Sequence, residues 1–115
     1  MTVTIWHNPR CSKSRQTLEL IRSKGIEPRI VEYLKTPPDR DELRRVLAAL
    51  RIAPRDLLRR GEPAYKARGL SDPALTDDDI IAAMLTEPVL IERPVVISGK
   101  RAAIGRPPEA VLDIL

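Results

Sequence analysis

The sequence predicts an α/β protein, because strand-like and helix-like segments alternate along a chain of 115 residues. Residues 3–6 form a short β-rich run that stops before the Asn8-Pro9 turn. Apolar residues at helical spacing follow and end at Gly25, and residues 29–33 resemble a second strand. This order predicts a strand–helix–strand unit with a right-handed crossover.

The middle of the chain is expected to be entirely helical over residues 39–87. Asp39 followed by Glu42 resembles a capping box, and apolar residues recur after it at helical spacing. Thr76 with Asp79 caps a further helix, which ends before Pro88. Two shorter helices are predicted at residues 54–60 and at residues 63–69.

The end of the chain returns to strands. Residues 95–98 and 102–104 flank Gly99-Lys100-Arg101, a pattern that predicts a hairpin. A last helix begins at the proline pair 107–108, and its residues Val111, Leu112 and Leu115 are expected to pack on the sheet. We therefore expect one domain over residues 1–115, with the helical segment 39–87 inserted into it.

The composition indicates the cellular location and the kind of partners to expect. The formal net charge of +4 favours anionic partners, but no basic run alternates with aromatic residues, so we expect no nucleic acid. The N-terminus lacks the pattern of a signal peptide, and the apolar runs are too short for a membrane helix. A single cysteine cannot form an internal disulfide. These features predict a cytoplasmic protein, and no long apolar segment calls for a second copy, so we expect a monomer.

Cys11 is the residue most suited to chemistry. It follows a predicted strand at the start of a predicted helix, where free N–H groups and the helix dipole favour a thiolate. The nearby Arg10, Lys13 and Arg15 act in the same way, and the same features form a cradle for an oxyanion. A lone cysteine is often a small buried hydrophobic residue. Its polar and basic neighbours favour reactivity here.

His7 and Ser14 are the candidate helpers. His7 could add a positive charge or accept a proton, and a purely structural hydrogen bond in the loop is an equal alternative. Ser14 is placed to donate a hydrogen bond to the sulfur or to cap the helix. One cysteine and one histidine are too few ligands for zinc, so we expect no metal site.

Two missing residues restrict the mechanism. Position 14 is serine, so there is no Cys-x-x-Cys pair, and an oxidised Cys11 needs an external thiol. Position 17, six residues after Cys11, is threonine, where a phosphatase-type phosphate loop needs arginine. A tyrosine phosphatase of low molecular weight is therefore disfavoured.

The run from His7 to Arg15 resembles the active-site loop of the glutaredoxin-dependent arsenate reductases. Further matches follow in order up to Glu92-Arg93-Pro94 and Gly105-Arg106-Pro107, so the resemblance covers essentially the whole chain. It implies a thioredoxin-like fold, in which a mixed four-stranded sheet carries an inserted all-helical segment. It also implies a cis peptide bond between Arg93 and Pro94.

The resemblance implies a role for each matched residue. Cys11 would be the nucleophile that forms an adduct with arsenate or a related oxyanion, with His7 and Ser14 as helpers. Glutathione would be the co-substrate and glutaredoxin the partner, with no bound cofactor. The residues implied in anion binding are Arg15, Arg59, Arg93 and Arg106.

The same resemblance leaves other functions open. The Arg10-Cys11-Ser12-Lys13 form of the loop resembles a chromosomal branch of the family, whose substrate could be a glutathionylated or otherwise oxidised thiol. A deglutathionylase or a general thiol oxidoreductase is therefore the alternative enzyme. A regulator that binds RNA polymerase and senses oxidation through a Cys-x-x-Cys pair shares the fold. Ser14 stands at the second cysteine position here, so the alternative from this class is polymerase binding without the redox switch.

Overall fold

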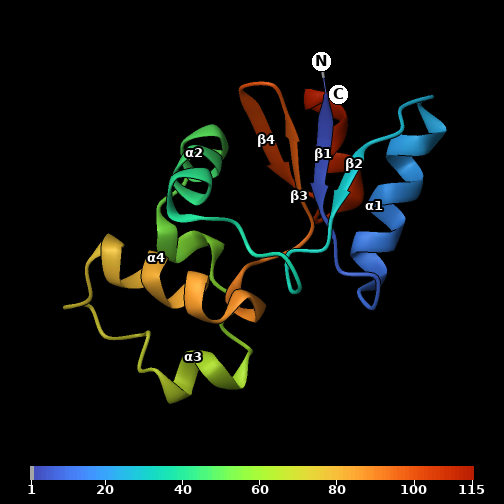
Figure 1. The fold of residues 1–115 in the computed structure, drawn as a ribbon. Coiled ribbons are helices and arrows are strands. Elements are labelled where there is room, and N and C mark those ends of the chain that lie inside the picture. Colours follow the sequence, from blue (N-terminus) through green and yellow to red (C-terminus); the bar gives the residue numbers. More distant parts are fainter. Residues whose placement is uncertain (1) are drawn as a thin grey trace. The chain divides into compact units, whose positions relative to one another are not determined.

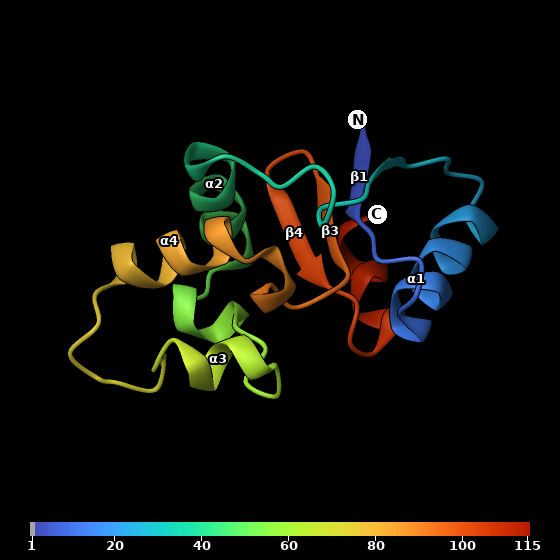
Figure 2. The same cartoon turned by 60° about the horizontal axis from the view of Figure 1, so that its bottom comes forward.

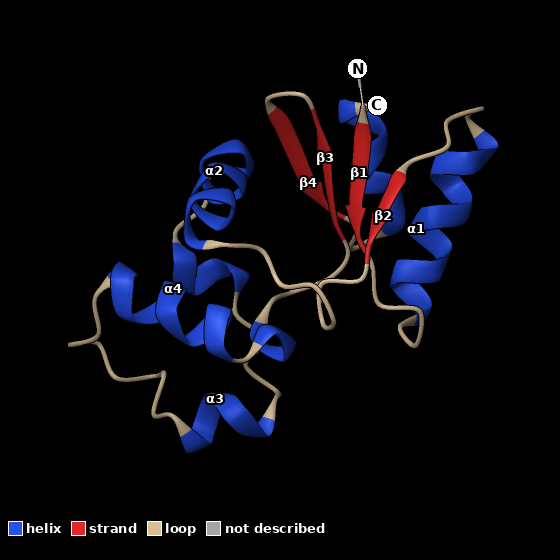
Figure 3. Cartoon of the chain, in the orientation of Figure 1, coloured by secondary structure: helices blue, strands red, loops and turns tan. Residues whose placement is uncertain are grey.

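The computed structural model describes residues 2–115, which divide into two compact units. The first unit joins the described residues up to Thr36 to the segment Arg93–Leu115, and the second unit is Pro37–Glu92. The first unit contains the strands and the second contains most of the helices (Figure 3). In the described part of the chain, no helix is long and apolar enough to cross a membrane.

The first unit is built on a mixed four-stranded sheet in the order β2-β1-β3-β4 (Figure 1). β1 pairs in parallel with β2 and antiparallel with β3, and β3 pairs antiparallel with β4. The sheet confirms the predicted α/β, thioredoxin-like fold. The strands are β1 (Val3–Trp6), β2 (Arg29–Val31), β3 (Val95–Ser98) and β4 (Arg101–Ile104).

Two helices of the first unit pack together on the sheet: α1 (Ser12–Ser23) and the C-terminal 3₁₀ helix η3 (Pro108–Ile114). They lie side by side in both views (Figures 1 and 2). Ile5 of β1, Ile21 of α1 and Val111 of η3 are fully buried against one another in the core cluster. The apolar stripes of both helices therefore anchor the loop that carries Cys11.

Three details differ from the sequence predictions. β2 ends at Val31, so Tyr33, which was expected in the strand, lies in the following turn and is buried there. β4 begins one residue earlier than predicted, at Arg101, because the hairpin turn is tighter. Leu112 was expected to pack on the sheet, but it is 37% exposed. Val111, its neighbour in η3, is fully buried as expected.

The second unit contains three α-helices, two of them with the predicted caps. The Asp39 side chain accepts from the Glu42 N–H at the start of α2, and Thr76 forms a reciprocal capping box with Asp79 at α4. Helix α3 ends with Gly69 close behind it, at a positive φ of 61°. The bounds are α2 (Arg40–Leu50), α3 (Pro63–Ala67) and α4 (Asp77–Thr86).

Two 3₁₀ helices complete this unit: η1 (Pro54–Leu57) and η2 (Pro88–Leu90). The predicted helix from Pro54 to Arg60 is therefore too long. It ends early because Leu58 forms an isolated antiparallel bridge with Ile91. The η2 turn, which the sequence prediction missed, leads directly into that bridge.

The core cluster of the first unit gives a test of the packing. We expect Ile21→Ala to lower the free energy of unfolding by about 2–5 kcal/mol, because Ile21 is fully buried and its truncation leaves a cavity. Leu112→Ala, at a 37% exposed position of η3, should change it by no more than about 0.5 kcal/mol. Urea denaturation measures both values. Equal losses in the two variants would contradict the described core.

Candidate active site

The loop between β1 and α1 presents Cys11 at a helix N-terminus. The His7 N–H donates to the Val31 carbonyl at 2.8 Å, which extends the β1–β2 ladder by one residue. The chain then turns, and the Cys11 N–H donates to the Asn8 carbonyl at 3.0 Å. Cys11 is the N-cap residue of α1, with φ −94° and ψ 122°, and no side chain caps this helix.

The sulfur of Cys11 has a charged partner. Nη2 of Arg106 donates to Sγ at 3.6 Å. Cys11 is 7% exposed, so burial alone would also fit a structural cysteine, but the guanidinium contact favours the reactive interpretation. A guanidinium beside a sulfur stabilises the thiolate, because it places a positive charge and an N–H donor next to the developing negative charge.

A second contact holds Arg106 in this place. Its Nε donates to the backbone carbonyl of Arg93 at 2.8 Å. Arg93 precedes β3 and Arg106 follows β4, and the pairing of Val95 with Ile104 brings these two strand ends together. The backbone of Arg93 thus fixes the guanidinium that contacts Cys11.

The same region contains two cis peptide bonds, Arg93-Pro94 and Arg106-Pro107. The first confirms the prediction made from the resemblance, and the second was not predicted. Between them lies Gly105, whose N–H donates to the Pro94 carbonyl at 2.9 Å. A Cβ at position 105 would lie 2.5 Å from Thr17 Oγ1 and 2.7 Å from Pro94 Cγ, so this close approach requires glycine.

Ser14 ties the loop to the helix. Its hydroxyl lies 2.6 Å from Nδ1 of His7 and accepts a hydrogen bond from the Asn8 N–H at 3.0 Å. The helix-cap interpretation of Ser14 is therefore wrong, because the cap position belongs to Cys11. In the described residues, the contact with the sulfur comes from Arg106 rather than from Ser14. Ser14 positions His7 and the loop.

His7 is buried, and burial is the main cause that lowers its pKa below the ordinary value of 6.5. The positive charges of Arg22 and Arg15 lower this pKa as well, whereas the carboxylate of Glu32 opposes them. His7 is therefore neutral at pH 7. Of the two roles expected of His7, a lowered pKa favours that of proton acceptor over that of a positive charge.

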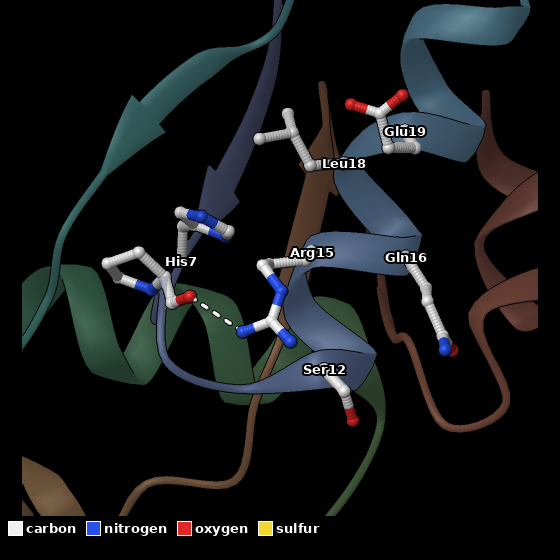
Figure 4. Close-up of a pocket in the computed structure, with 7 residues that line it drawn as sticks. His7, Ser12, Arg15, Gln16, Leu18 and Glu19 are labelled. Atoms are coloured by element: carbon white, nitrogen blue, oxygen red, sulfur yellow. Dashed lines mark hydrogen bonds between the residues drawn. The ribbon is translucent and has the colours of Figure 1, made fainter.

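The side chain of Arg15 contacts the loop before Cys11. Its Nη1 donates to the Pro9 carbonyl at 2.9 Å, and its guanidinium borders a hollow that His7 also lines (Figure 4). Glu19 and Leu18 of α1 close this hollow. Arg15 thus stiffens the loop through a backbone contact and leaves part of its guanidinium facing open space.

Six of the seven predicted site residues belong to the first unit, and the seventh, Arg59, belongs to the second. Arg59 forms ion pairs with two carboxylates there: Nη1 lies 2.5 Å from Glu62 Oε1, and Nε lies 3.6 Å from Glu92 Oε1. The sequence prediction did not anticipate these pairs. Its role in anion binding stays a prediction.

Two side chains near the loop have roles that the sequence analysis did not assign to them. Asn8 accepts from the Arg10 N–H through Oδ1 at 3.0 Å, so its side chain shapes the turn before Cys11. The carboxylate of Glu32 raises the pKa of His7 and so opposes the effect of burial. Both had a signal: asparagine before proline favours a side-chain-stabilised turn, and the parallel pairing of Trp6 with Val31 places the next residues of the two strands side by side.

Comparisons with known proteins identify the family of this chain. The sequence profile of the ArsC family matches residues 6–114. The chain belongs to the ArsC family. It is 49% identical over 113 residues to an arsenate reductase of Escherichia coli, a match that covers 98% of this chain and 80% of that relative.

Two further family members resemble it closely. The uncharacterized protein YfgD of Escherichia coli (strain K12) is 48% identical over 114 residues, with 98% of this chain and 96% of that protein covered. The structure of an arsenate reductase from Vibrio cholerae superposes with a TM-score of 0.98 at 47% identity, covering 100% of this chain and 98% of that one. The ArsC fold therefore spans the chain.

The lowered pKa of His7 predicts a pH effect on stability. The folded state disfavours protonation of His7, so its contribution is complete above the unfolded pKa of 6.5 and decreases as the pH falls towards the lower native pKa. We expect the difference in unfolding free energy between the wild type and His7→Gln to shrink over that range. Urea denaturation between about pH 7.5 and 5 measures it. A difference that stays constant with pH would contradict a buried, neutral His7.

Proposed function

We propose that this ArsC-family protein is an arsenate reductase, in which the thiolate of Cys11 attacks the arsenic of a bound arsenate. The observation that carries the proposal is the contact of Arg106 Nη2 with Cys11 Sγ at the uncapped N-terminus of α1. Relatives named arsenate reductase, 49% and 48% identical over nearly the whole chain, support the choice of substrate.

In the first step the arginines bind the oxyanion and offset its charge, a role that suits the planar guanidinium fork. The thiolate forms a bond to arsenic, and one arsenate oxygen, which takes up two protons, leaves as water. The product is a cysteine–arsenate adduct with pentavalent arsenic. Neutral His7 accepts or relays a proton near the loop, and Arg106 changes its partner from sulfur to the bound oxyanion.

In the second step a glutathione thiolate attacks the sulfur of Cys11. The electron pair of the sulfur–arsenic bond passes to arsenic, which is reduced to the trivalent state and departs as arsenite. The two thiols are oxidised to a mixed disulfide between Cys11 and glutathione. The chain has one cysteine, so an external dithiol of the glutaredoxin type must remove the glutathione and restore the thiol. This cycle fits a monomer in a reducing cytoplasm.

A glutathione-linked thiol oxidoreductase or deglutathionylase is the second candidate. The observation that favours it is the lone free cysteine, Cys11. Its thiolate would attack a glutathionylated thiol, release that thiol and take up the glutathione, and a second thiol would then remove the glutathione as in the last step above. The two candidates share Cys11 and differ in the need for an oxyanion.

Substitutions at the sulfur contact test the arsenate mechanism. We expect Cys11→Ser to abolish arsenite formation, and Arg106→Lys to lower kcat/KM by about 100-fold, because lysine cannot contact both the Arg93 carbonyl and the sulfur through a fork. Arg29→Lys is the matched control, since Arg29 is exposed on β2. Steady-state arsenite production measures all three. Retained turnover in Cys11→Ser would rule out the mechanism.

The reductant is tested separately. We expect arsenite to form with glutathione plus glutaredoxin, and mass spectrometry after omission of glutaredoxin to find one glutathione on residue 11. The same protein is assayed with a glutathionylated peptide. Turnover of that peptide without any turnover of arsenate would favour the thiol oxidoreductase.

A further inference from the structure

The ion pairs around Arg59 are a feature that the mechanism above does not use. The side chains of Arg59, Glu62 and Glu92 are 25%, 19% and 28% exposed. By comparison, the side chains of the ion pairs Arg22–Glu27, Arg44–Asp78 and Arg68–Glu87 are at least 39% exposed. Solvent and salt therefore screen the Arg59 cluster less than they screen the other pairs.

Backbone hydrogen bonds place these three residues together. The Arg59 N–H donates to the Leu90 carbonyl, and the Glu92 N–H donates to the Leu57 carbonyl, both at 2.8 Å, on either side of the bridge described above. The Glu62 N–H donates to the Arg59 carbonyl at 3.3 Å. The fold of the second unit therefore fixes the position of this cluster, because the backbone of each of the three residues is hydrogen-bonded within that unit.

The two carboxylates contact different nitrogens of the Arg59 guanidinium. Glu62 contacts Nη1, and Glu92 lies beside Nε. A guanidinium binds an oxyanion through two parallel N–H groups, which must be Nη2 together with either Nη1 or Nε. An oxyanion that binds Arg59 through two N–H groups therefore displaces one carboxylate or shares a guanidinium nitrogen with it. Both carboxylates also repel a dianion.

We propose that Glu62 and Glu92 compete with the oxyanion substrate for Arg59 and so act as specificity-determining residues that weaken the binding of dianions. The inference rests on the proposed function, because it takes Arg59 as a ligand of the oxyanion. It adds that the affinity of this chain for arsenate and phosphate is set by two carboxylates outside the cysteine loop.

Glutamine substitutions test the competition, because glutamine keeps the size of glutamate and removes its charge. We expect Glu62→Gln and Glu92→Gln each to lower the KM for arsenate and the inhibition constant of phosphate by about threefold or more, with kcat changed by less than about twofold. Glu87→Gln is the matched control. It removes one carboxylate from the Arg68 ion pair of the same unit, so it reports the effect of net charge alone.

Arg59 variants separate the inference from the proposed function. If Arg59→Ala raises the KM for arsenate and Glu92→Gln does not lower it, the competition is wrong and the arsenate mechanism stands. If Arg59→Ala leaves that KM unchanged, Arg59 is no substrate ligand and the inference is overturned. In the double variant Arg59→Ala/Glu92→Gln the glutamine should have no further effect on KM.

A binding measurement compares the affinities of the variants for phosphate without turnover. We expect phosphate to raise the midpoint of thermal unfolding more in Glu62→Gln and Glu92→Gln than in the wild type or in Glu87→Gln. Equal midpoint shifts in all four proteins, or shifts that are smaller in the two glutamine variants, would overturn the competition.

Discussion

The site depends on one contact between residues that lie 95 positions apart in the sequence, the donation from Arg106 to the sulfur of Cys11. The contact requires the β3–β4 hairpin, which brings Arg106 to the carbonyl of Arg93, and it requires glycine at position 105. A cysteine that is 7% exposed would otherwise count as core. The Arg106 contact distinguishes it from a core cysteine, because it places a positive charge and an N–H donor against the sulfur.

The N-terminus of α1 differs from those of α2 and α4 in its capping. Asp39 and Thr76 cap α2 and α4 with their side chains, which contributes about 1 kcal/mol to each helix. At α1 the cap position holds Cys11, and no side chain caps that helix. The first N–H groups of α1 therefore remain available to an anion, and their partial positive charge acts on the sulfur. The chain gives up local helix stability at the position where the proposed chemistry needs those donors.

The features predictable from the sequence are those that depend on neighbouring residues. The strand at residues 3–6, the capping box at Thr76 and the turn at Gly99 follow from local pattern and turn chemistry. Contacts that arise from the tertiary fold were not predictable. The hydroxyl of Ser14 contacts His7 instead of capping the helix, because the first turn of α1 packs against the end of β1. The role of Arg93 was expected of its side chain, whereas its observed contact with Arg106 uses the backbone carbonyl.

The proposed competition at Arg59 makes the affinity for the substrate depend on more than the matched arginines. The position matches the family pattern, yet its guanidinium already contacts two carboxylates, one three residues further along and one next to Arg93. Both carboxylates lie close in the sequence to a matched arginine, so a single substitution at either position changes the charge around Arg59 and leaves every matched arginine in place. Members of one family with the same loop and the same arginines can therefore differ in their affinity for dianions. The residues that pair with a binding arginine determine how much of its charge reaches the substrate.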